Sequence, residues 1–375
     1  MRAALKNAAL LGVASVAALA VGEVFVRVVA PQQLAIDPRR VHPRWFYASH
    51  PAIGFTMNPE FRGRFRLPEF DTRVAISSLG IRDREHGPRA EGTRRIVVLG
   101  DSYTFGWGVE AGERYVDRLE DRLNGTEAGR WDVVKAGINA YGTREQAAWL
   151  RGHGWDLEPD LVLVQFCMGN DFSDNEAAGY HVADGYLVAN RDVPAPADTA
   201  RTTLLGSVKR WARERSHLYV LVRDRTRALR AVDENGAGRP SELPDFNRSV
   251  DDGLPATVRF LREIAEDARR RAVPVLVVIV PMRHQLYESR AADPAILEHP
   301  NRAIVAACEE AGLATFDLLP GFRDRVARGS ARLYFRVDRH WTRDGHRLAG
   351  DLLHDELVRR GLVPSLGAAP PTPLG

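Results

Sequence analysis

The sequence predicts an α/β protein in which a central parallel sheet of five strands is covered by helices on both faces. Between residues 94 and 360, short apolar runs alternate with amphipathic helical periods, and this alternation is typical of parallel sheets. The apolar runs are continuous, which favours strands that are buried on both faces. Hydrophobic residues make up 45% of the chain and charged residues of both signs 27%, so a globally disordered chain is excluded.

The elements of this fold can be placed in order along the chain. The predicted strands of the sheet are the apolar runs at residues 96–99, 132–136, 159–166, 275–280 and 314–317. The predicted helices are the amphipathic segments at residues 113–123, 144–151, 258–271, 302–311 and 344–360. In the third of these helices, Val258, Leu261 and Ile264 share one face, as expected of a helix packed on a sheet. A further strand is expected at residues 72–77, ahead of the sheet.

The chain of 375 residues divides into four expected parts. Residues 1–30 form a signal anchor or signal peptide, and residues 31–93 form an N-terminal cap. Residues 94–360 form the main domain, with an insertion at residues 176–250 after the third strand. The proline-rich residues 361–375 form a disordered tail.

The N-terminus predicts export. Residues 8–30 are predominantly apolar and follow two basic residues. Their uncharged part, residues 8–22, is shorter than the roughly 20 residues that span a bilayer, but Glu23 and Arg27 are one helical turn apart and can pair at an interface. Three interpretations stay open: an uncleaved anchor, a signal peptide cleaved at Ala18-Leu19-Ala20, and a buried helix. Either of the first two places the main domain outside the inner membrane, in the periplasm or secreted.

Charge and cysteine content exclude several classes of protein. Lys and Arg number 52 against 49 Asp and Glu, and no nucleic-acid-binding motif is present, so no nucleic-acid partner is expected. Residues 201–230 hold nine basic and two acidic residues, a local charge of 9 − 2 = +7. They form either an amphipathic helix against anionic lipid or an acidic glycan, or a solvated basic helix packed through its aromatic residues. The two cysteines, Cys167 and Cys308, exclude a disulfide-stapled scaffold and a four-cysteine zinc site.

Candidate functional residues follow the first three strands of the predicted sheet. Ser102 follows the first strand, Gly137 ends the second, and Asn170 follows the third. The carboxyl ends of parallel strands share one edge, where open α/β folds build their sites. A serine at a strand-to-helix turn can act as a nucleophile, and a glycine N–H or an asparagine amide can stabilise an oxyanion. Taken alone, each residue fits an N-cap, a turn or an Asx turn.

A histidine near the C-terminus supplies the base that such a serine needs. His340 lies two residues after Asp338, which can hold the imidazole in one tautomer. Asp338, His340, Asp344 and His346 also cluster as metal ligands would. No other segment of the sequence supplies further ligands that would match this cluster. We therefore expect neither a metal nor a cofactor. Together, the four segments predict one site that combines a serine nucleophile, oxyanion donors, a base and its orienting acid.

These segments resemble the four sequence blocks of the SGNH/GDSL hydrolase superfamily, which are named for Ser, Gly, Asn and His. The four blocks correspond to VLGDSYTFGWGV at residues 98–109, AGINAYGT at 136–143, MGND at 168–171 and DRHWTRDGH at 338–346. The resemblance spans about residues 94–355. The apolar N-terminus and residues 76–83 resemble membrane-tethered bacterial members.

The resemblance implies a three-layer α/β/α, flavodoxin-like fold and a role for each site residue. Ser102 would be the nucleophile, His340 the general base and Asp338 its orienting acid. The Ser102 N–H, the Gly137 N–H and the Asn170 side chain would form the oxyanion hole. The commonest fourth block has two residues between Asp and His, whereas only Arg339 separates them here. This D-x-H-W form resembles the polysaccharide O-acetyltransferase and acetylesterase branch.

The leading hypothesis is a serine esterase that removes an acyl group, with the O-acetyl group of an extracytoplasmic carbohydrate as the expected substrate. One alternative is an O-acyltransferase that uses the same triad to modify cell-surface or exopolysaccharide. A second is a non-catalytic, membrane-tethered glycan-binding protein, and a lipid-directed esterase is a third. The acyl chain and the oligomeric state stay open.

Overall fold

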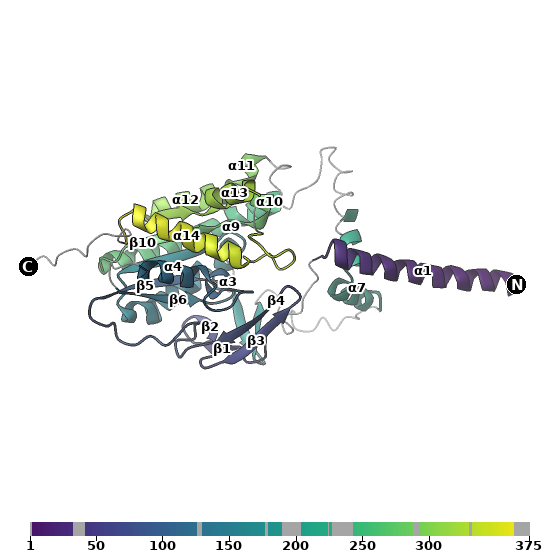
Figure 1. Ribbon diagram of the computed structural model, residues 1–375, viewed down its shortest axis with the longest axis horizontal. Coiled ribbons are helices and arrows are strands. Elements are labelled where there is room, and N and C mark those ends of the chain that lie inside the picture. Colours follow the sequence, from purple (N-terminus) through teal and green to yellow (C-terminus); the bar gives the residue numbers. More distant parts are fainter. Residues whose placement is uncertain are drawn as a thin grey trace, which may run out of the picture. The chain divides into compact units, whose positions relative to one another are not determined.

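The computed structural model describes most of the chain, namely residues 2–32, 42–125, 130–176, 179–189, 204–223, 225–226, 243–287, 293–329 and 332–363. The chain divides into two compact units, and many of their elements are labelled in Figure 1. The smaller unit joins Met1–Arg40 to Pro194–Ser241, and the larger joins Val41–Val193 to Glu242–Gly375. From residue 364 onward, the expected tail at residues 361–375 lies outside the described residues.

The larger unit is built on a parallel sheet with the strand order β11-β10-β7-β5-β6. Its strands are β5 (Thr93–Gly100), β6 (Arg130–Gly137), β7 (Leu161–Cys167), β10 (Val275–Val280) and β11 (Ala314–Asp317). The first strand, β5, lies between β6 and β7, which is the flavodoxin-like order of a doubly wound sheet. The predicted α/β fold with five parallel strands is confirmed, and each predicted strand overlaps one of these five.

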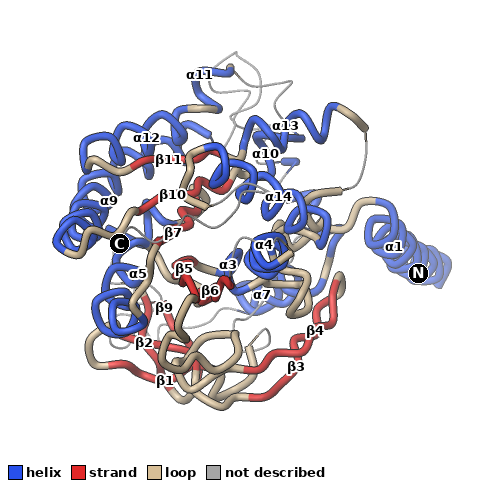
Figure 2. The backbone as a smooth tube through the Cα atoms, turned by 60° about the vertical axis from the view of Figure 1, so that its left-hand side comes forward, coloured by secondary structure: helices blue, strands red, loops and turns tan. Residues whose placement is uncertain are grey.

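Helices cover both faces of the sheet. Figure 2 shows the strands in a row, with α12, α9 and α5 on one side and α13, α14 and α4 on the other. The first face is covered by α5 (Thr143–Trp149), α9 (Leu243–Arg270) and α12 (His299–Ala311). The second face is covered by α4 (Tyr115–Asn124), α10 (Arg283–Tyr287), α13 (Leu319–Ala327) and α14 (Arg343–Arg359).

Two buried cores result from this layering. Alternate residues of a strand point to opposite faces, so Val97 and Leu99 of β5 join one apolar cluster while Ile96 and Val98 join the other. Shorter elements complete this part of the unit: α3 (Ser102–Phe105), the π-helical turn Leu150–Gly154, the 3₁₀ turn Trp155–Leu157, α6 (Asp171–Glu176) and α11 (Pro294–Leu297).

Three antiparallel hairpins add to the larger unit. They are β1–β2 (Tyr47–His50 and Gly54–Met57), β3–β4 (Arg62–Leu67 and Phe70–Ala75) and β8–β9 (Tyr180–Ala183 and Tyr186–Ala189). The first two belong to the region expected as a cap. Their buried aromatic residues, such as Phe55 and Phe65, join the same apolar cluster as Val97 and Leu99 of the sheet. The cap region therefore shares its core with the sheet domain.

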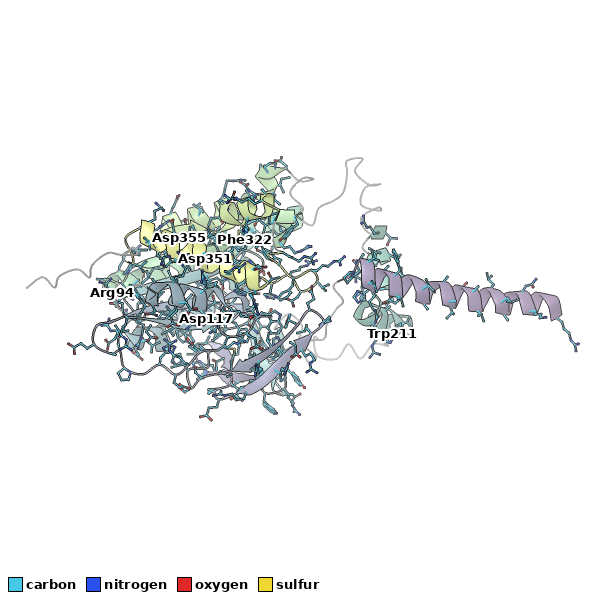
Figure 3. All side chains as sticks on the ribbon, in the orientation of Figure 1. Arg94, Asp117, Trp211, Phe322, Asp351 and Asp355 are labelled. Carbon is cyan, nitrogen blue, oxygen red and sulfur yellow. The ribbon has the colours of Figure 1, made fainter. Side chains whose placement is uncertain are left out.

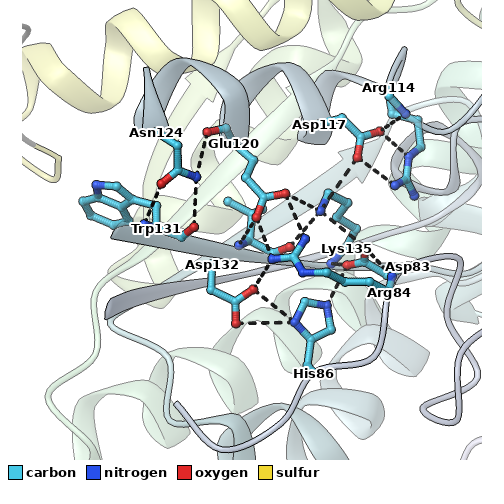
Figure 4. A network of polar contacts seen from close by, with 12 residues as sticks. Asp83, Arg84, His86, Arg114, Asp117, Glu120, Asn124, Trp131, Asp132 and Lys135 are labelled. Carbon is cyan, nitrogen blue, oxygen red and sulfur yellow. Dashed lines mark hydrogen bonds and ion pairs between the residues drawn. The ribbon is translucent and has the colours of Figure 1, made fainter. Parts of the chain in front are cut away.

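A buried polar network ties the end of the cap region to β6 and α4 (Figure 4). Lys135 of β6 is only 1% exposed, and its Nζ donates to Asp83 Oδ1 at 3.3 Å and to Glu120 Oε2 at 2.6 Å. His86 in turn lies 2.9 Å from Asp83 Oδ2. Burial would raise the pKa of Asp83, but the hydrogen bond with His86 and the charge of Lys135 lower it. The ammonium is thereby neutralised in the interior, which a buried charge requires.

The smaller unit holds α1 (Arg2–Val29), α7 (Leu204–Arg215) and a further helical segment at residues 217–223. Within α1, Ala9–Val29 is long and apolar enough to cross a membrane, with a mean hydropathy of 2.2. The described part of the basic segment 201–230 is helical except at residue 216, and a helix is common to both alternatives expected for it.

Candidate active site

The turn between β5 and α3 positions Ser102. Asp101 caps α3 by accepting a 2.9 Å hydrogen bond from the Tyr103 N–H on Oδ1, and its own N–H donates to Gln165 Oε1 at 3.0 Å. A short polar side chain suits this capping position. The turn is therefore held from both the helix and the neighbouring strand. It places Ser102 at the carboxyl edge of the sheet, as the sequence predicted.

His340 and Asp338 complete a continuous hydrogen-bonded chain with Ser102. The Ser102 Oγ lies 2.8 Å from His340 Nε2, and His340 Nδ1 lies 2.6 Å from Asp338 Oδ1. The structure thus brings together the three residues that the sequence singled out as nucleophile, base and orienter. Since Ser102 and His340 are 238 positions apart in sequence, this contact is a product of the tertiary fold.

Asp338 is ionised by its surroundings. Burial would raise its pKa, but the contacts with His340 and the 3.0 Å hydrogen bond from Trp107 Nε1 to Oδ2 lower it. A carboxylate at this position accepts the Nδ1–H of the imidazole and leaves Nε2 as the acceptor for the serine hydroxyl. The Tyr103 ring also packs against the imidazole, with the ring centroids 5.2 Å apart. The geometry therefore suits proton transfer from Ser102 to His340.

Gly137 lies at the same edge of the sheet. It pairs in register with Gly100, so the ends of β5 and β6 lie side by side. A Cβ atom at Gly137 would overlap the backbone of Thr104 and Phe105 in α3. Glycine is therefore required at this position by the close approach of α3.

Asn170 follows β7 and is partly exposed. Its Nδ2 donates to Asp174 Oδ2 at 2.8 Å and approaches Asp171 Oδ1 at 3.3 Å. These contacts fix the side chain at the start of α6. No contact among the described residues joins the amide to Ser102 or His340, so the structure brings Asn170 to the same sheet edge without joining it to the triad.

Two buried carboxyl groups support the turns beneath the site. Asp101 and Asp171 are 1% and 0% exposed, and Asp171 Oδ2 accepts a 3.0 Å hydrogen bond from the Cys167 N–H. Burial raises the pKa of Asp171 well above its usual range, and the charge of Asp101 raises it further. The shared burial of Asp101 and Asp171 therefore disfavours a charge on both carboxyl groups at once. Both residues hold turns, and neither contacts His340.

His346 belongs to the structural interior. It is fully buried near the start of α14, and its Nδ1 accepts a 3.3 Å hydrogen bond from the Tyr115 N–H. The cluster of Asp338, His340, Asp344 and His346 therefore does not converge on one point. Over the part of the chain that the structure describes, no group of three or more His, Cys, Asp or Glu side chains is arranged to hold a metal ion.

Sequence reasoning missed two residues that touch this constellation. Trp107 lies within the first block, but nothing in the pattern singles out its indole N–H as a partner of Asp338. Glu69 lies in the cap region and accepts hydrogen bonds from the backbone of the Asp338 loop. No local motif marks it, because its partners lie more than two hundred residues away.

Comparison with known proteins places this geometry in a family. Residues 98–348 match the model of the GDSL-like Lipase/Acylhydrolase family, and no curated protein matches the chain. Among solved structures, a lipase/acylhydrolase from Enterococcus faecalis is 14% identical, with a TM-score of 0.40, covering 74% of this chain and 100% of its own. The psychrotrophic esterase EstA from Pseudoalteromonas sp. is 12% identical, with a TM-score of 0.38, covering 72% and 98%.

Proposed function

The chain belongs to the GDSL-like lipase/acylhydrolase family and is a carboxylic ester hydrolase, and we propose that Ser102 is its nucleophile, His340 its general base and Asp338 the acid that orients the base. The observation that carries this proposal is the unbroken chain of contacts from Ser102 Oγ to His340 Nε2 at 2.8 Å and from His340 Nδ1 to Asp338 Oδ1 at 2.6 Å. Distances in this range allow direct proton transfer between the partners.

The reaction then follows from the geometry. Ser102 Oγ attacks the ester carbonyl carbon while its proton passes to His340 Nε2. The imidazolium, stabilised by the ionised Asp338, protonates the departing alcohol oxygen, and an acyl-serine is left. A water molecule gives its proton to His340 and attacks the acyl carbon, which releases the carboxylic acid and restores the hydroxyl of Ser102.

The proposed oxyanion hole consists of the Ser102 N–H, the Gly137 N–H and the Asn170 amide. Their common position at the ends of β5, β6 and β7 supports this assignment. The Asn170 amide donates to Asp174 and Asp171. We infer that it exchanges one of these carboxyl groups for the developing oxyanion, whose charge is concentrated on a single oxygen.

The proposed substrate is an O-acetyl ester of an extracytoplasmic carbohydrate. Support for it comes from the Asp338-Arg339-His340-Trp341 segment, whose form resembles the polysaccharide O-acetyltransferase and acetylesterase branch. The same acyl-enzyme could pass its acyl group to a sugar hydroxyl instead of water. Acetate release measured beside acetyl transfer, with one acetylated glycan as donor and a deacetylated glycan as acceptor, separates the two outcomes.

Substitution of the nucleophile tests the proposed function. Ser102→Ala should lower p-nitrophenyl acetate turnover by at least about 10³-fold, because only binding and the oxyanion donors would remain, while the melting temperature stays near that of the wild type. Ser78→Ala is the matched control, since the Ser78 hydroxyl bonds Glu85 in the cap region. Wild-type turnover by Ser102→Ala would rule out the triad.

We also propose that α1 is a retained membrane anchor. The predicted cleavage site, Ala18-Leu19-Ala20, lies inside the continuous helix α1. Two residues later, Gly22 lies against Leu218 of the insertion, where a Cβ atom would be 3.2 Å from the leucine Cδ2. The unbroken helix and the contact at Gly22 support retention of this segment.

Glu23 supports the same proposal by joining α1 to the insertion. Its carboxylate accepts hydrogen bonds from the Ser216 hydroxyl at 2.8 Å and from the N–H groups of His217 and Leu218 at 3.0 and 2.9 Å. It thereby caps the helix at residues 217–223, and Arg27 pairs with it at 3.0 Å. Glu23, which interrupts the apolar N-terminal segment, is thus hydrogen-bonded and ion-paired near the C-terminal end of α1.

The helix α7 adds an amphipathic surface to this unit. Trp211, labelled in Figure 3, is 56% exposed and Val208 is 52% exposed, with the exposed bases Lys209, Arg213 and Arg215 beside them. Tryptophan and arginine side chains on one helix are typical of segments that lie at a lipid headgroup layer. We propose that α7 lies in that layer, where its cations meet anionic headgroups.

A further inference from the structure

The loop that carries Asp338 is a narrow hairpin with a constrained tip. Tyr334 and Trp341 form an antiparallel bridge, and the Phe335 N–H donates to the His340 carbonyl at 2.8 Å. The tip between these legs therefore comprises residues 336–339. Within it, Arg339 has a φ of +76°, a left-handed conformation that a residue with a side chain adopts at a cost.

Glu69 binds the backbone of this tip with both carboxylate oxygens. Its Oε1 accepts the Arg336 N–H at 2.8 Å, and its Oε2 accepts the N–H groups of Val337 and Asp338, each at 2.8 Å. Three successive N–H groups that converge on one anion form a cradle in which each bond is charge-assisted. The Asp338 peptide is therefore held from outside the loop.

The position of Glu69 is itself fixed by the cap region. It lies in the turn of the β3–β4 hairpin, between Leu67 and Phe70, which pair in register. The ring of Phe70 packs against Trp107 and Phe335, with centroid separations of 5.7 and 5.4 Å. Phe70 thus anchors the β3–β4 hairpin between two residues of the site region. One is Trp107, whose indole bonds Asp338, and the other is Phe335, which begins the Asp338 loop.

The side chain of Asp338 has little conformational freedom, so it cannot compensate for a displacement of its backbone. Its Oδ1 contacts His340 Nδ1 at 2.6 Å and accepts the His340 N–H at 3.3 Å, while Oδ2 accepts the Trp107 indole. Because the Asp338 side chain is short and both of its oxygens are hydrogen-bonded, a shift of its backbone peptide would also displace the carboxylate. Misplacement of a reacting group by about 1 Å can cost about 10²-fold in rate, so whatever fixes this peptide affects the reaction.

From these contacts we propose that Glu69 is a positioning residue for the triad, through which the cap region sets the frame of Asp338 and hence the orientation of His340. The inference rests on the proposed role of Ser102, His340 and Asp338. It gives the cap a function in catalysis that neither its fold nor the family motifs require.

The test compares two carboxylates that each accept backbone N–H groups across the junction between the cap region and the main domain. Glu69→Gln places an amide group against backbone donors, and it should lower kcat for p-nitrophenyl acetate about 10- to 100-fold with KM within about twofold. Glu110→Gln is the matched control, because Glu110 accepts the Arg73 N–H of β4 at 3.1 and 3.2 Å without touching the Asp338 loop. It should keep kcat close to wild type. Glu69→Asp, which keeps the charge but is one methylene shorter, should fall between them and replaces Glu69→Gln if that variant fails to fold.

A double substitution separates positioning from a general loss of structure. In an Asp338→Asn background, Glu69→Gln should have less than about a twofold further effect, since both changes act through one contact.

Three results would overturn the proposal: a wild-type kcat for Glu69→Gln, equal losses in Glu69→Gln and Glu110→Gln, or an undiminished loss in the Asp338→Asn background. Failure of this inference is distinguishable from failure of the proposed function. Ser102→Ala would remain inactive in the first case and would retain turnover in the second.

Discussion

The imidazole of His346 is an uncharged group in the interior of the molecule. Burial, together with the charge of Arg114, lowers its pKa to about 3, whereas an unfolded histidine titrates near 6.5. As pH falls from about 6.5 to about 3, the unfolded chain therefore binds a proton that the folded chain does not. The free energy of unfolding falls over this range by up to about 1.4 kcal/mol per pH unit from this residue.

Replacement of His346 should remove that part of the acid sensitivity. In His346→Gln the amide oxygen can still accept the Tyr115 N–H, so urea unfolding between pH 6.5 and 3 should show a shallower slope than the wild type. His354→Gln on the same helix is the matched control, because the His354 ring bonds Asp355 at 3.0 Å. Equal slopes in His346→Gln and the wild type would contradict a neutral buried imidazole.

Residues whose role depends on a local turn could be predicted from the sequence, and residues whose role depends on a distant partner could not. Ser102 and Gly137 sit at the ends of apolar runs, where the strand-to-helix pattern itself points to a site. His340 could be proposed as a base because Asp338 lies two positions before it, and the structure places their side chains in contact. Glu69 carries no such pattern, since its value comes from N–H groups that only the folded chain brings within reach.

The packing of α3 on the end of β6 depends on the absence of one methyl group. In Gly137→Ala, the Cβ atom would overlap the backbone of Thr104 and Phe105. Backbone atoms cannot relieve such an overlap by changing rotamer, as a side chain can. We expect a loss of about 1–3 kcal/mol in the free energy of unfolding, with a fall in esterase activity because α3 carries Ser102. Guanidinium denaturation and p-nitrophenyl acetate turnover measure the two effects.

Gly152→Ala provides the control for this change. A Cβ atom at Gly152 would meet nothing within 4 Å, so alanine in this helical turn should leave stability unchanged or raise it slightly. A Gly137→Ala variant as stable as Gly152→Ala would show that α3 can shift away from β6 without cost.

Among the elements, the parallel strands were the most predictable because burial on both faces leaves continuous apolar runs. The helix α9 begins at Leu243, well before the predicted residue 258, and it contains Pro255. A proline normally ends a helix when it is met in sequence, so the segment before it gives no helical signal. The hairpins β1–β2, β3–β4 and β8–β9 were missed except for the strand expected at residues 72–77, because their short strands are defined by pairing.

At the scale of the whole molecule, the proposed anchor predicts what the mature protein contains. The protein extracted from membranes should have an intact mass that includes residues 1–20, and it should resist release by alkaline carbonate. Glu23→Ala should leave this association in place but should speed tryptic cleavage at Arg213 and Arg215, because the helix at 217–223 loses its cap. A mass that lacks residues 1–20, with the protein in the soluble fraction, would establish a cleaved signal peptide instead.

In the larger unit, a row of surface ion pairs joins two helices that are distant in sequence. Asp351 and Asp355 of α14, labelled in Figure 3, pair with Arg118 and Arg122 of α4 at 2.8–3.0 Å. Because these pairs are partly exposed, each contributes little by itself. They nevertheless fix the helix that follows His340 beside the one that follows the Ser102 turn.

The wide separation of the proposed site residues along the chain has a consequence for when activity begins. Glu69 and Ser102 lie in the first third of the sequence, whereas Asp338 and His340 lie near its end. A chain delivered across a membrane from its N-terminus would emerge with a serine that has no base, and the last strand and helix must follow before proton transfer is possible. Because the C-terminal residues emerge last, a partly translocated chain would have no activity on esters on either side of the membrane.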